Sequence, residues 1–95
     1  MITSKTTLEE LTDAAMTAVK LYKDLNNNPE NKRYVDEVTD SSWTKYDIMV
    51  LLYMKSEADK QGIKVEELSD EFCNKIDDHI EYFRVLLKKF YENLS

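Results

Sequence analysis

Apolar residues recur at helical spacing along almost the whole chain. The first set is spaced three or four residues apart, which places its members on one face of a helix. It consists of Leu8, Leu11, Ala15, Ala18, Tyr22 and Leu25. Thr6 or Thr7 can cap the start of this helix, and Pro29 lies just beyond its end because Pro cannot continue a helix. The pattern predicts a helix over residues 7–26.

A short second helix is predicted directly after the first. Asn28 suits the N-cap position, and Pro29 suits the first helical position because its missing N–H is not needed there. The polar run Asp40–Ser42 marks the next break. These signals predict a short helix over residues 29–39.

The central helix contains the longest apolar run of the chain, Ile48–Met54, with seven residues in succession. It is predicted to begin near Trp43, behind Ser41 or Ser42 as cap, and to end at Gly62, which favours left-handed backbone. Seven consecutive apolar residues cover every side of a helix. Such a helix is either enclosed by its neighbours or shared with a partner chain.

The last third of the chain, residues 63–95, contains no Gly and no Pro. Its apolar residues keep helical spacing without a change of phase: Val65, Leu68, Phe72, Ile76, Ile80, Phe83, Leu87, Phe90 and Leu94. We predict one helix over about 63–94, roughly 45 Å long at about 1.5 Å per residue. The alternative divides the segment around Asn74 into helices at 64–73 and 77–93.

The chain as a whole is predicted to be all-α, a small helical bundle of three long helices and one short helix. Its 95 residues suffice for a single domain, residues 1–95, and are too few for two. One Gly and one Pro are too few for the many turns of a strand-rich fold.

The acidic excess of the chain is concentrated in one segment. The formal net charge is −6, and residues 66–81 alone hold seven acidic side chains against one base, whereas the remaining chain holds twelve of each sign. The seven are Glu66, Glu67, Asp70, Glu71, Asp77, Asp78 and Glu81. Such a segment repels nucleic-acid phosphates and attracts basic surfaces. We therefore expect a protein partner with a basic surface and no direct contact with nucleic acid.

Candidate catalytic and metal-binding residues are sparse. Oxygen-bearing side chains alternate over Asp24–Glu30 as in a calcium loop, but Pro29 replaces the required Gly and Val35 the bidentate Glu. His79 and Cys73 are six residues apart, so on a helix their side chains point about 120° apart and cannot share a zinc ion. We expect no catalytic residue, no cofactor, no metal site and no enzymatic activity.

The expected location is the cytoplasm. A single cysteine fits a reducing compartment. The N-terminal residues lack the basic and then apolar pattern of a signal peptide. No apolar run approaches the roughly 20 residues of a membrane span, so no membrane association is expected.

Residues 43–91 resemble the tri-helical pattern of Myb/SANT-type helix-turn-helix proteins. In that pattern Trp43 opens the first helix, Val65–Phe72 forms a short second helix, and Asp77–Tyr91 forms the helix that reads DNA. The resemblance implies a regulator or nucleic-acid accessory protein. However, the reading helix would begin with the carboxylates of Asp77–Glu81, which oppose contact with bases and phosphates. A protein of this type would therefore bind protein more readily than DNA.

Surplus apolar side chains suggest an interface. On the central helix, Tyr46, Met49 and Tyr53 lie on the side opposite the expected core side, which comprises Leu51, Met54 and Ala58. On the C-terminal helix, Tyr82 and Val85 point away from the core. Tyr and Met are enriched at protein interfaces. Either the helix over 29–39 covers Met49 and Tyr53, or a second chain does, and a second copy would make a homodimer.

These features together favour a non-enzymatic, acidic helical binding protein that acts through protein–protein contacts. An inhibitor, immunity factor or adaptor fits this description, by analogy with small acidic proteins of phages and plasmids. Such a protein can occupy a basic or nucleic-acid-binding surface of its partner. The alternative is a helix-turn-helix regulator or nucleic-acid accessory protein.

Overall fold

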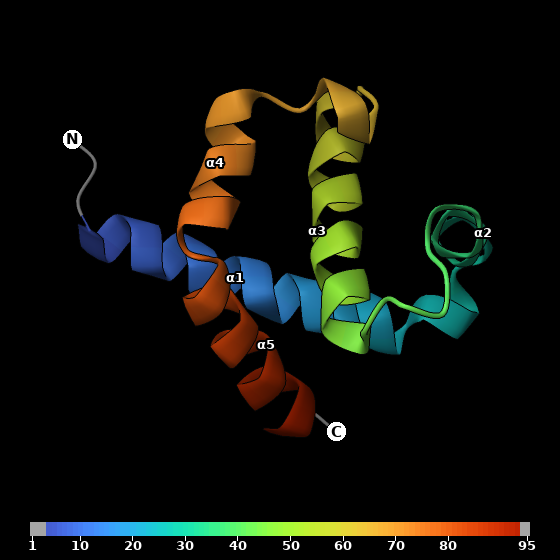
Figure 1. Ribbon diagram of the computed structural model, residues 1–95, viewed down its shortest axis with the longest axis horizontal. Helices are drawn as coiled ribbons and strands as arrows, with labels where there is room; N and C mark the ends of the chain where they lie inside the picture. The colour runs from blue at the N-terminus through green and yellow to red at the C-terminus, as the bar shows by residue number, and fades with distance from the viewer. Residues whose placement is uncertain (1–3, 94–95) are drawn as a thin grey trace.

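The computed structural model describes the backbone of residues 4–93, which contains five α-helices and no strand. The helices are α1 (Ser4–Lys23), α2 (Pro29–Val38), α3 (Lys45–Gln61), α4 (Asp70–Asp78) and α5 (Ile80–Asn93), with short 3-10 turns at Leu25–Asn27 and Val65–Glu67. The predicted all-α class is confirmed. In Figure 1, α1 lies across α3 and α5, α4 stands beside α3, and α2 lies beyond the C-terminal end of α1.

The local signals at Asn28 and Gly62 act as predicted. The side chain of Asn28 accepts a hydrogen bond from the backbone N–H of Asn31 at 3.1 Å, and Pro29 follows as the first residue of α2. Gly62 ends α3 in left-handed conformation with φ of 69°. Asn is favoured at the N-cap position because its side-chain oxygen accepts a backbone N–H of the first turn. Gly adopts positive φ without strain because it has no Cβ.

Two helix starts differ from the prediction. α1 begins at Ser4, so Thr6 and Thr7 lie within it and do not precede it. α3 begins at Lys45 and is capped by Thr44, whose hydroxyl accepts the N–H of Asp47 at 3.1 Å. The Asp47 carboxylate in turn accepts the N–H of Thr44 at 3.1 Å, which completes a capping box.

The predicted cap at Ser41 or Ser42 is therefore wrong. Both the N–H and the hydroxyl of Ser42 donate to the carboxylate of Asp40. These bonds hold a turn before α3 and lower the pKa of Asp40, first through the hydroxyl and then through the N–H.

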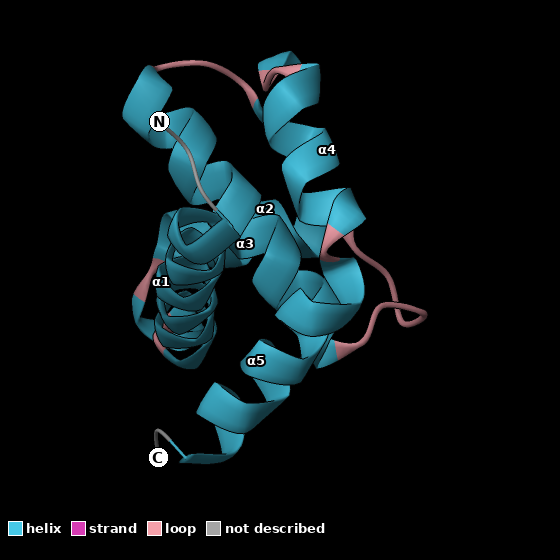
Figure 2. Cartoon of the chain, turned by 90° about the vertical axis from the view of Figure 1, so that its left-hand side faces the viewer, coloured by secondary structure: helices cyan, strands magenta, loops and turns pink. Residues whose placement is uncertain are grey.

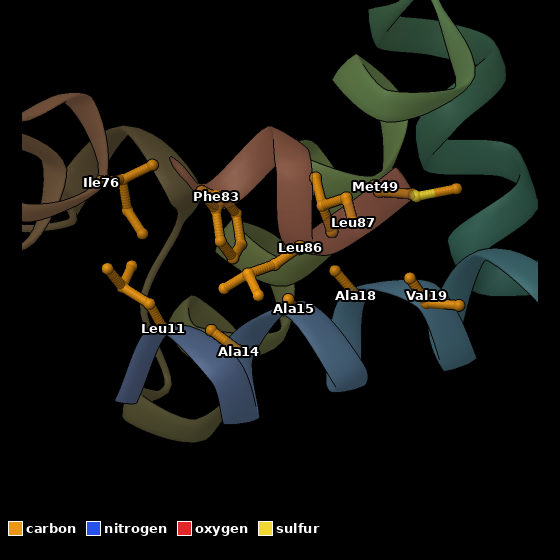
Figure 3. Packing of buried hydrophobic residues seen from close by; sticks show 10 residues of the cluster. All are labelled: Leu11, Ala14, Ala15, Ala18, Val19, Met49, Ile76, Phe83, Leu86 and Leu87. Atoms are coloured by element: carbon orange, nitrogen blue, oxygen red, sulfur yellow. The ribbon is translucent and has the colours of Figure 1, made fainter. Parts of the chain in front are cut away.

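The C-terminal segment is divided into two helices, so the single long helix over 63–94 is not observed. Ser69 caps α4 by accepting the N–H of Phe72 at 3.1 Å, and the backbone departs from helical geometry at His79. A straight helix of about 45 Å would extend beyond α1, whose 20 residues span about 30 Å. The bend keeps both Ile76 and Phe83 over α1, as Figure 3 shows.

The main core lies where α1 meets α3, α4 and α5. It comprises Leu11, Ala14, Ala15, Ala18, Val19, Met49, Ile76, Phe83, Leu86 and Leu87 (Figure 3). Three of the five core residues on α1 are alanines, and these small side chains let the crossing helices approach closely. Phe83 and Leu87 of α5 are fully buried against this face.

The helix with the apolar run, α3, is largely enclosed by the protein itself. Met49 and Ala58, 0% and 1% exposed, are nine residues apart and so lie on opposite sides of the helix. On the side of α3 that faces α2, the Lys55 side chain is buried, and its Nζ lies 3.0 Å from Glu30 and 2.8 Å from Asp59. Burial lowers the pKa of the Lys55 ammonium, but the hydrogen bonds to both carboxylates outweigh burial and raise it above its usual value.

Candidate protein-binding surface

The acidic residues of the segment are all exposed. All seven carboxylates lie on exposed residues, distributed over the 3-10 turn Val65–Glu67, α4 and the first turn of α5. On α4, the acidic residues lie opposite the inward-facing Phe72 and Ile76, as helical spacing dictates. Figure 2 shows α4 at the outer edge of the fold. We call these seven side chains the acidic face.

Among residues 8–93, no base is paired with the acidic face. Lys75, the only base between Glu66 and Glu81, has its ammonium 3.0 Å from Glu10 on α1. Within residues 8–93, none of the seven carboxylates takes part in an ion pair. Glu67 alone has a fixed local role, because its side chain accepts the N–H of Lys64 at 2.8 Å. The face therefore presents net negative charge to solvent.

The predicted interface on α3 is covered by the chain's own helices. Met49 is 0% exposed and packs among Leu87 and Val19 in the main core (Figure 3). The ring of Tyr53 stacks on Phe72, with centroids 6.0 Å apart, and meets the ring of Phe83 edge-on. The prediction that a partner contacts Met49 is therefore wrong for the folded chain, because α1 and α5 occupy that side.

The helix that covers this side also differs from the prediction. The short helix α2, expected to lie over Met49 and Tyr53, packs instead on the side of α3 that carries Lys55. Burial, with smaller contributions from the carboxylates of Glu57 and Glu10, raises the pKa of the Tyr53 hydroxyl above its usual value.

Tyr46 belongs to a cluster of tyrosines at the C-terminal end of α5. The ring of Tyr91 meets those of Tyr46 and Tyr22 edge-on, with centroid distances of 6.3 Å and 5.9 Å. Two ammonium groups flank Tyr91, with Nζ of Lys45 4.6 Å and Nζ of Lys23 5.0 Å from the ring centroid. These contacts stabilise the packing of the C-terminal end of α5 between α1 and α3.

Tyr82 and Val85 lie on the outer side of α5, as predicted. They are 42% and 62% exposed, and Val85 is the more exposed of the two. They are three residues apart and so lie side by side on the helix. Whether a partner contacts them remains a prediction.

A groove between α3 and α5 was not anticipated from the sequence. Its volume is about 400 Å³, and it is lined by Ser42, Trp43, Asp47, Val50, Leu51, Met54, Ile80 and Arg84. Arg84 donates to Asp47 at 2.6 Å across the groove, so the two charged groups in its lining neutralise each other. The all-round apolar run of α3 was the available signal. Neighbouring helices cover three sides of α3. Val50, Leu51 and Met54 lie on the fourth side, which forms one wall of the groove.

The residues considered for metal chemistry stay apart in the fold. His79 is exposed at the bend between α4 and α5, and Cys73 is half-buried on α4. Within the described part of the chain, no three His, Cys, Asp or Glu side chains converge as metal ligands would. Nor does any helix in that part combine the length and apolar content of a membrane span.

Comparison with known proteins identifies no relative of this chain. No protein-family model, no curated protein and no solved structure matches the chain.

Proposed function

We propose that this chain is a non-enzymatic binding protein that docks through its acidic face on a basic surface of another protein. The observation that supports the proposal is the set of seven exposed carboxylates that have no ion-pair partner among residues 8–93. Like charges held close together destabilise the chain that carries them. A basic partner would relieve this repulsion, and it would be attracted from a distance as well as in contact.

An inhibitor, immunity factor or adaptor would use such a face in the same way. A carboxylate row along α4 and the start of α5 presents negative charges to lysine and arginine side chains that otherwise hold phosphates. Occupying a nucleic-acid-binding surface of the partner is therefore part of the proposal.

The helix-turn-helix alternative is less well supported by the helix boundaries. α4 ends at Asp78 and α5 begins at Ile80, so one residue separates them where the motif has a turn of three or four. The would-be reading helix also begins beside the exposed Asp77 and Glu81. We expect no retention of mixed-sequence duplex DNA at low salt. Binding that falls steeply as salt rises would favour the alternative instead.

The decisive experiment compares partner capture by two variants with the same change in net charge. The first neutralises the acidic face on α4 with Asp70→Asn, Glu71→Gln, Asp77→Asn and Asp78→Asn. The matched control neutralises four exposed acids elsewhere, with Glu9→Gln, Asp13→Asn, Glu37→Gln and Glu92→Gln. Each protein is immobilised, exposed to host-cell extract, and its bound proteins are identified by mass spectrometry.

We expect the wild type and the control to retain the same basic protein, and the α4 variant to lose it. Raising the salt concentration should release that protein, because the contact is largely between exposed charges. If the α4 variant retains the same proteins as the wild type, the acidic face is not the binding surface.

A further inference from the structure

A second hollow of the surface lies between the start of α2 and the second half of α3, and we call it the α2–α3 pocket. Its volume is about 410 Å³. Its lining combines apolar side chains with polar ones, among them Leu21, Leu52, Asn28, Asn31 and Ser56. None of the seven carboxylates of the acidic face lines it. A ligand bound in this pocket would therefore be independent of the proposed docking contact.

Asn31 contributes a polar group that the fold does not use. The residue is only 9% exposed, and no atom among residues 8–93 forms a hydrogen bond with its side-chain carboxamide. Its backbone N–H is bonded separately, to the side chain of Asn28 at 3.1 Å. A buried polar group without a protein partner costs stability, and native proteins complete such groups with water, an ion or a ligand.

The carboxamide of Asn31 opens on the α2–α3 pocket. In the described part of the chain, every side-chain nitrogen or oxygen that is cut off from solvent has a hydrogen-bond partner. Since the Asn31 carboxamide has none, it keeps contact with solvent, and the pocket is the space that this residue lines. The half-buried Ser56 lines the same pocket, and its hydroxyl is likewise unbonded among residues 8–93. Both groups are therefore available to a molecule in the pocket.

The charges around the α2–α3 pocket favour a neutral ligand. Glu30 and Asp59 line the pocket, and both carboxylates are held by the ammonium of Lys55, at 3.0 Å and 2.8 Å. Lys60 lines the pocket as well. Two carboxylates and two ammonium groups carry no net charge together. The carboxylates oppose an anionic ligand and the ammonium groups oppose a cationic one, so neither sign of charge is selected.

We propose that the α2–α3 pocket binds a small neutral molecule through an amide-type edge, that is, a hydrogen-bond donor and an acceptor side by side on one planar group. The Asn31 carboxamide presents the complementary pair and can bond to both at once, as asparagine does with adenine. Ser56 offers one further hydrogen bond, and the half-buried Leu21 offers apolar contact to the body of the ligand. The pocket volume lies within the range of about 300–1,000 Å³ that is usual for small-molecule sites. Carboxamides and nucleobases both carry such an edge.

Four small molecules test the pocket, and the side-chain amide signals of isotope-labelled protein report binding by NMR. Nicotinamide is the carboxamide probe and adenosine the nucleobase probe. Pyridine, which is the ring without the amide, and nicotinate, which carries a carboxylate instead, are the controls. The Asn31 signals are assigned by their loss in Asn31→Leu. We expect nicotinamide or adenosine to shift them with a dissociation constant in the millimolar range, as suits so small a ligand. The tighter of the two identifies the source of the edge, and the controls should cause no shift.

Two variants with the same chemical change separate the pocket from the rest of the surface. Asn31→Leu removes the carboxamide at similar side-chain size and should weaken binding at least about tenfold, as the loss of two hydrogen bonds implies. Asn93→Leu makes the same change at the exposed end of α5, outside the pocket, and should alter the affinity less than about twofold. Asn31→Leu should also unfold in urea no earlier than the wild type, because the fold does not use the carboxamide. Ser56→Ala is a second, milder variant and should weaken binding about threefold.

The inference is overturned if neither nicotinamide nor adenosine shifts the Asn31 signals, because water alone then completes the carboxamide. It is also overturned if pyridine or nicotinate binds as tightly as nicotinamide, or if Asn31→Leu and Ser56→Ala both bind as tightly as the wild type. A marked loss of stability in Asn31→Leu would assign the carboxamide to the fold and not to a ligand. The variant neutralised on α4 should bind the probes as the wild type does, so failure of the pocket and failure of the acidic face are separate results.

Discussion

Replacing Met49 tests whether the apolar run of α3 is closed by the protein itself. Met49 is 0% exposed and packs against α1 and α5. Truncating a fully buried methionine removes its transfer free energy and leaves a cavity, so Met49→Ala should cost about 2–5 kcal/mol. Domains of this size are stable by about 5–14 kcal/mol. Met49→Ala should therefore lower the unfolding midpoint markedly, and Met49→Glu, which buries an unpaired charge, should leave little folded protein.

The assay is urea unfolding, followed by circular dichroism and by the emission of Trp43. Val85→Glu is the matched control, because Val85 is 62% exposed on α5 and a surface change there should alter the free energy of unfolding by less than about 0.5 kcal/mol. The reasoning is refuted if Met49→Glu unfolds at nearly the same urea concentration as Val85→Glu. Met49 would then lie on an open surface, as a dimer or partner interface requires.

Three further predictions concern the cap of α4, the buried lysine and alkaline pH. Ser69→Ala removes the acceptor for the Phe72 N–H and should cost about 1 kcal/mol in urea unfolding, whereas Ser69→Asn should cost little. Lys55→Met keeps the buried stem and leaves only exposed carboxylates behind, so its cost should stay within about 1 kcal/mol, whereas Lys55→Ala should cost about 2 kcal/mol. Burial raises the folded-state pKa of Tyr53 above the usual tyrosine value of about 10. The stability contributed by its neutral form is therefore complete below about pH 10 and is lost as pH rises through the folded-state pKa. An absorbance titration should show Tyr53 ionising late, and urea unfolding of Tyr53→Phe should lose less stability between neutral and alkaline pH than the wild type.

Signals that act within one turn of the chain were readable from the sequence. Asn28 caps α2 and Gly62 ends α3 because each residue type supplies what its position needs, a side-chain acceptor or freedom at positive φ. The Thr44–Asp47 capping box is a signal of the same kind, and the sequence contains it. Ser41 and Ser42 are equally good caps in isolation, and only the structure shows that Ser42 bonds to Asp40 while Thr44 bonds to Asp47.

The bend at His79 could not be predicted from local signals. No Gly or Pro interrupts the segment, and the apolar stripe runs through the bend without a change of phase. Ile76 before the bend and Phe83 after it both pack in the main core with α1, so the bend belongs to tertiary packing and not to a local sequence signal. The start of α4 was more accessible, because Ser69 followed by Asp70 and Glu71 is a typical N-terminal pattern.

The candidate surface was predicted in part. The acidic face follows directly from composition, because charged side chains without partners remain at the surface. Met49 is predicted at an interface but is buried, and Met54 is predicted in the core but lines the groove. The sequence of a helix that is apolar on all sides does not indicate which neighbouring helix covers which side. That choice depends on where α1, α2 and α5 pack, and the groove exists only on the side they leave open.

Carboxyl footprinting of the complex tests the proposed docking surface most directly. A reagent that labels free carboxylates is applied to the protein alone and to the protein with its captured basic partner, and the labelled positions are quantified by mass spectrometry. We predict reduced labelling across the acidic face, from Glu66 to Glu81, and unchanged labelling at Glu9, Asp13 and Glu37. Protection confined to those three residues, with the acidic face labelled equally in both samples, would contradict the account.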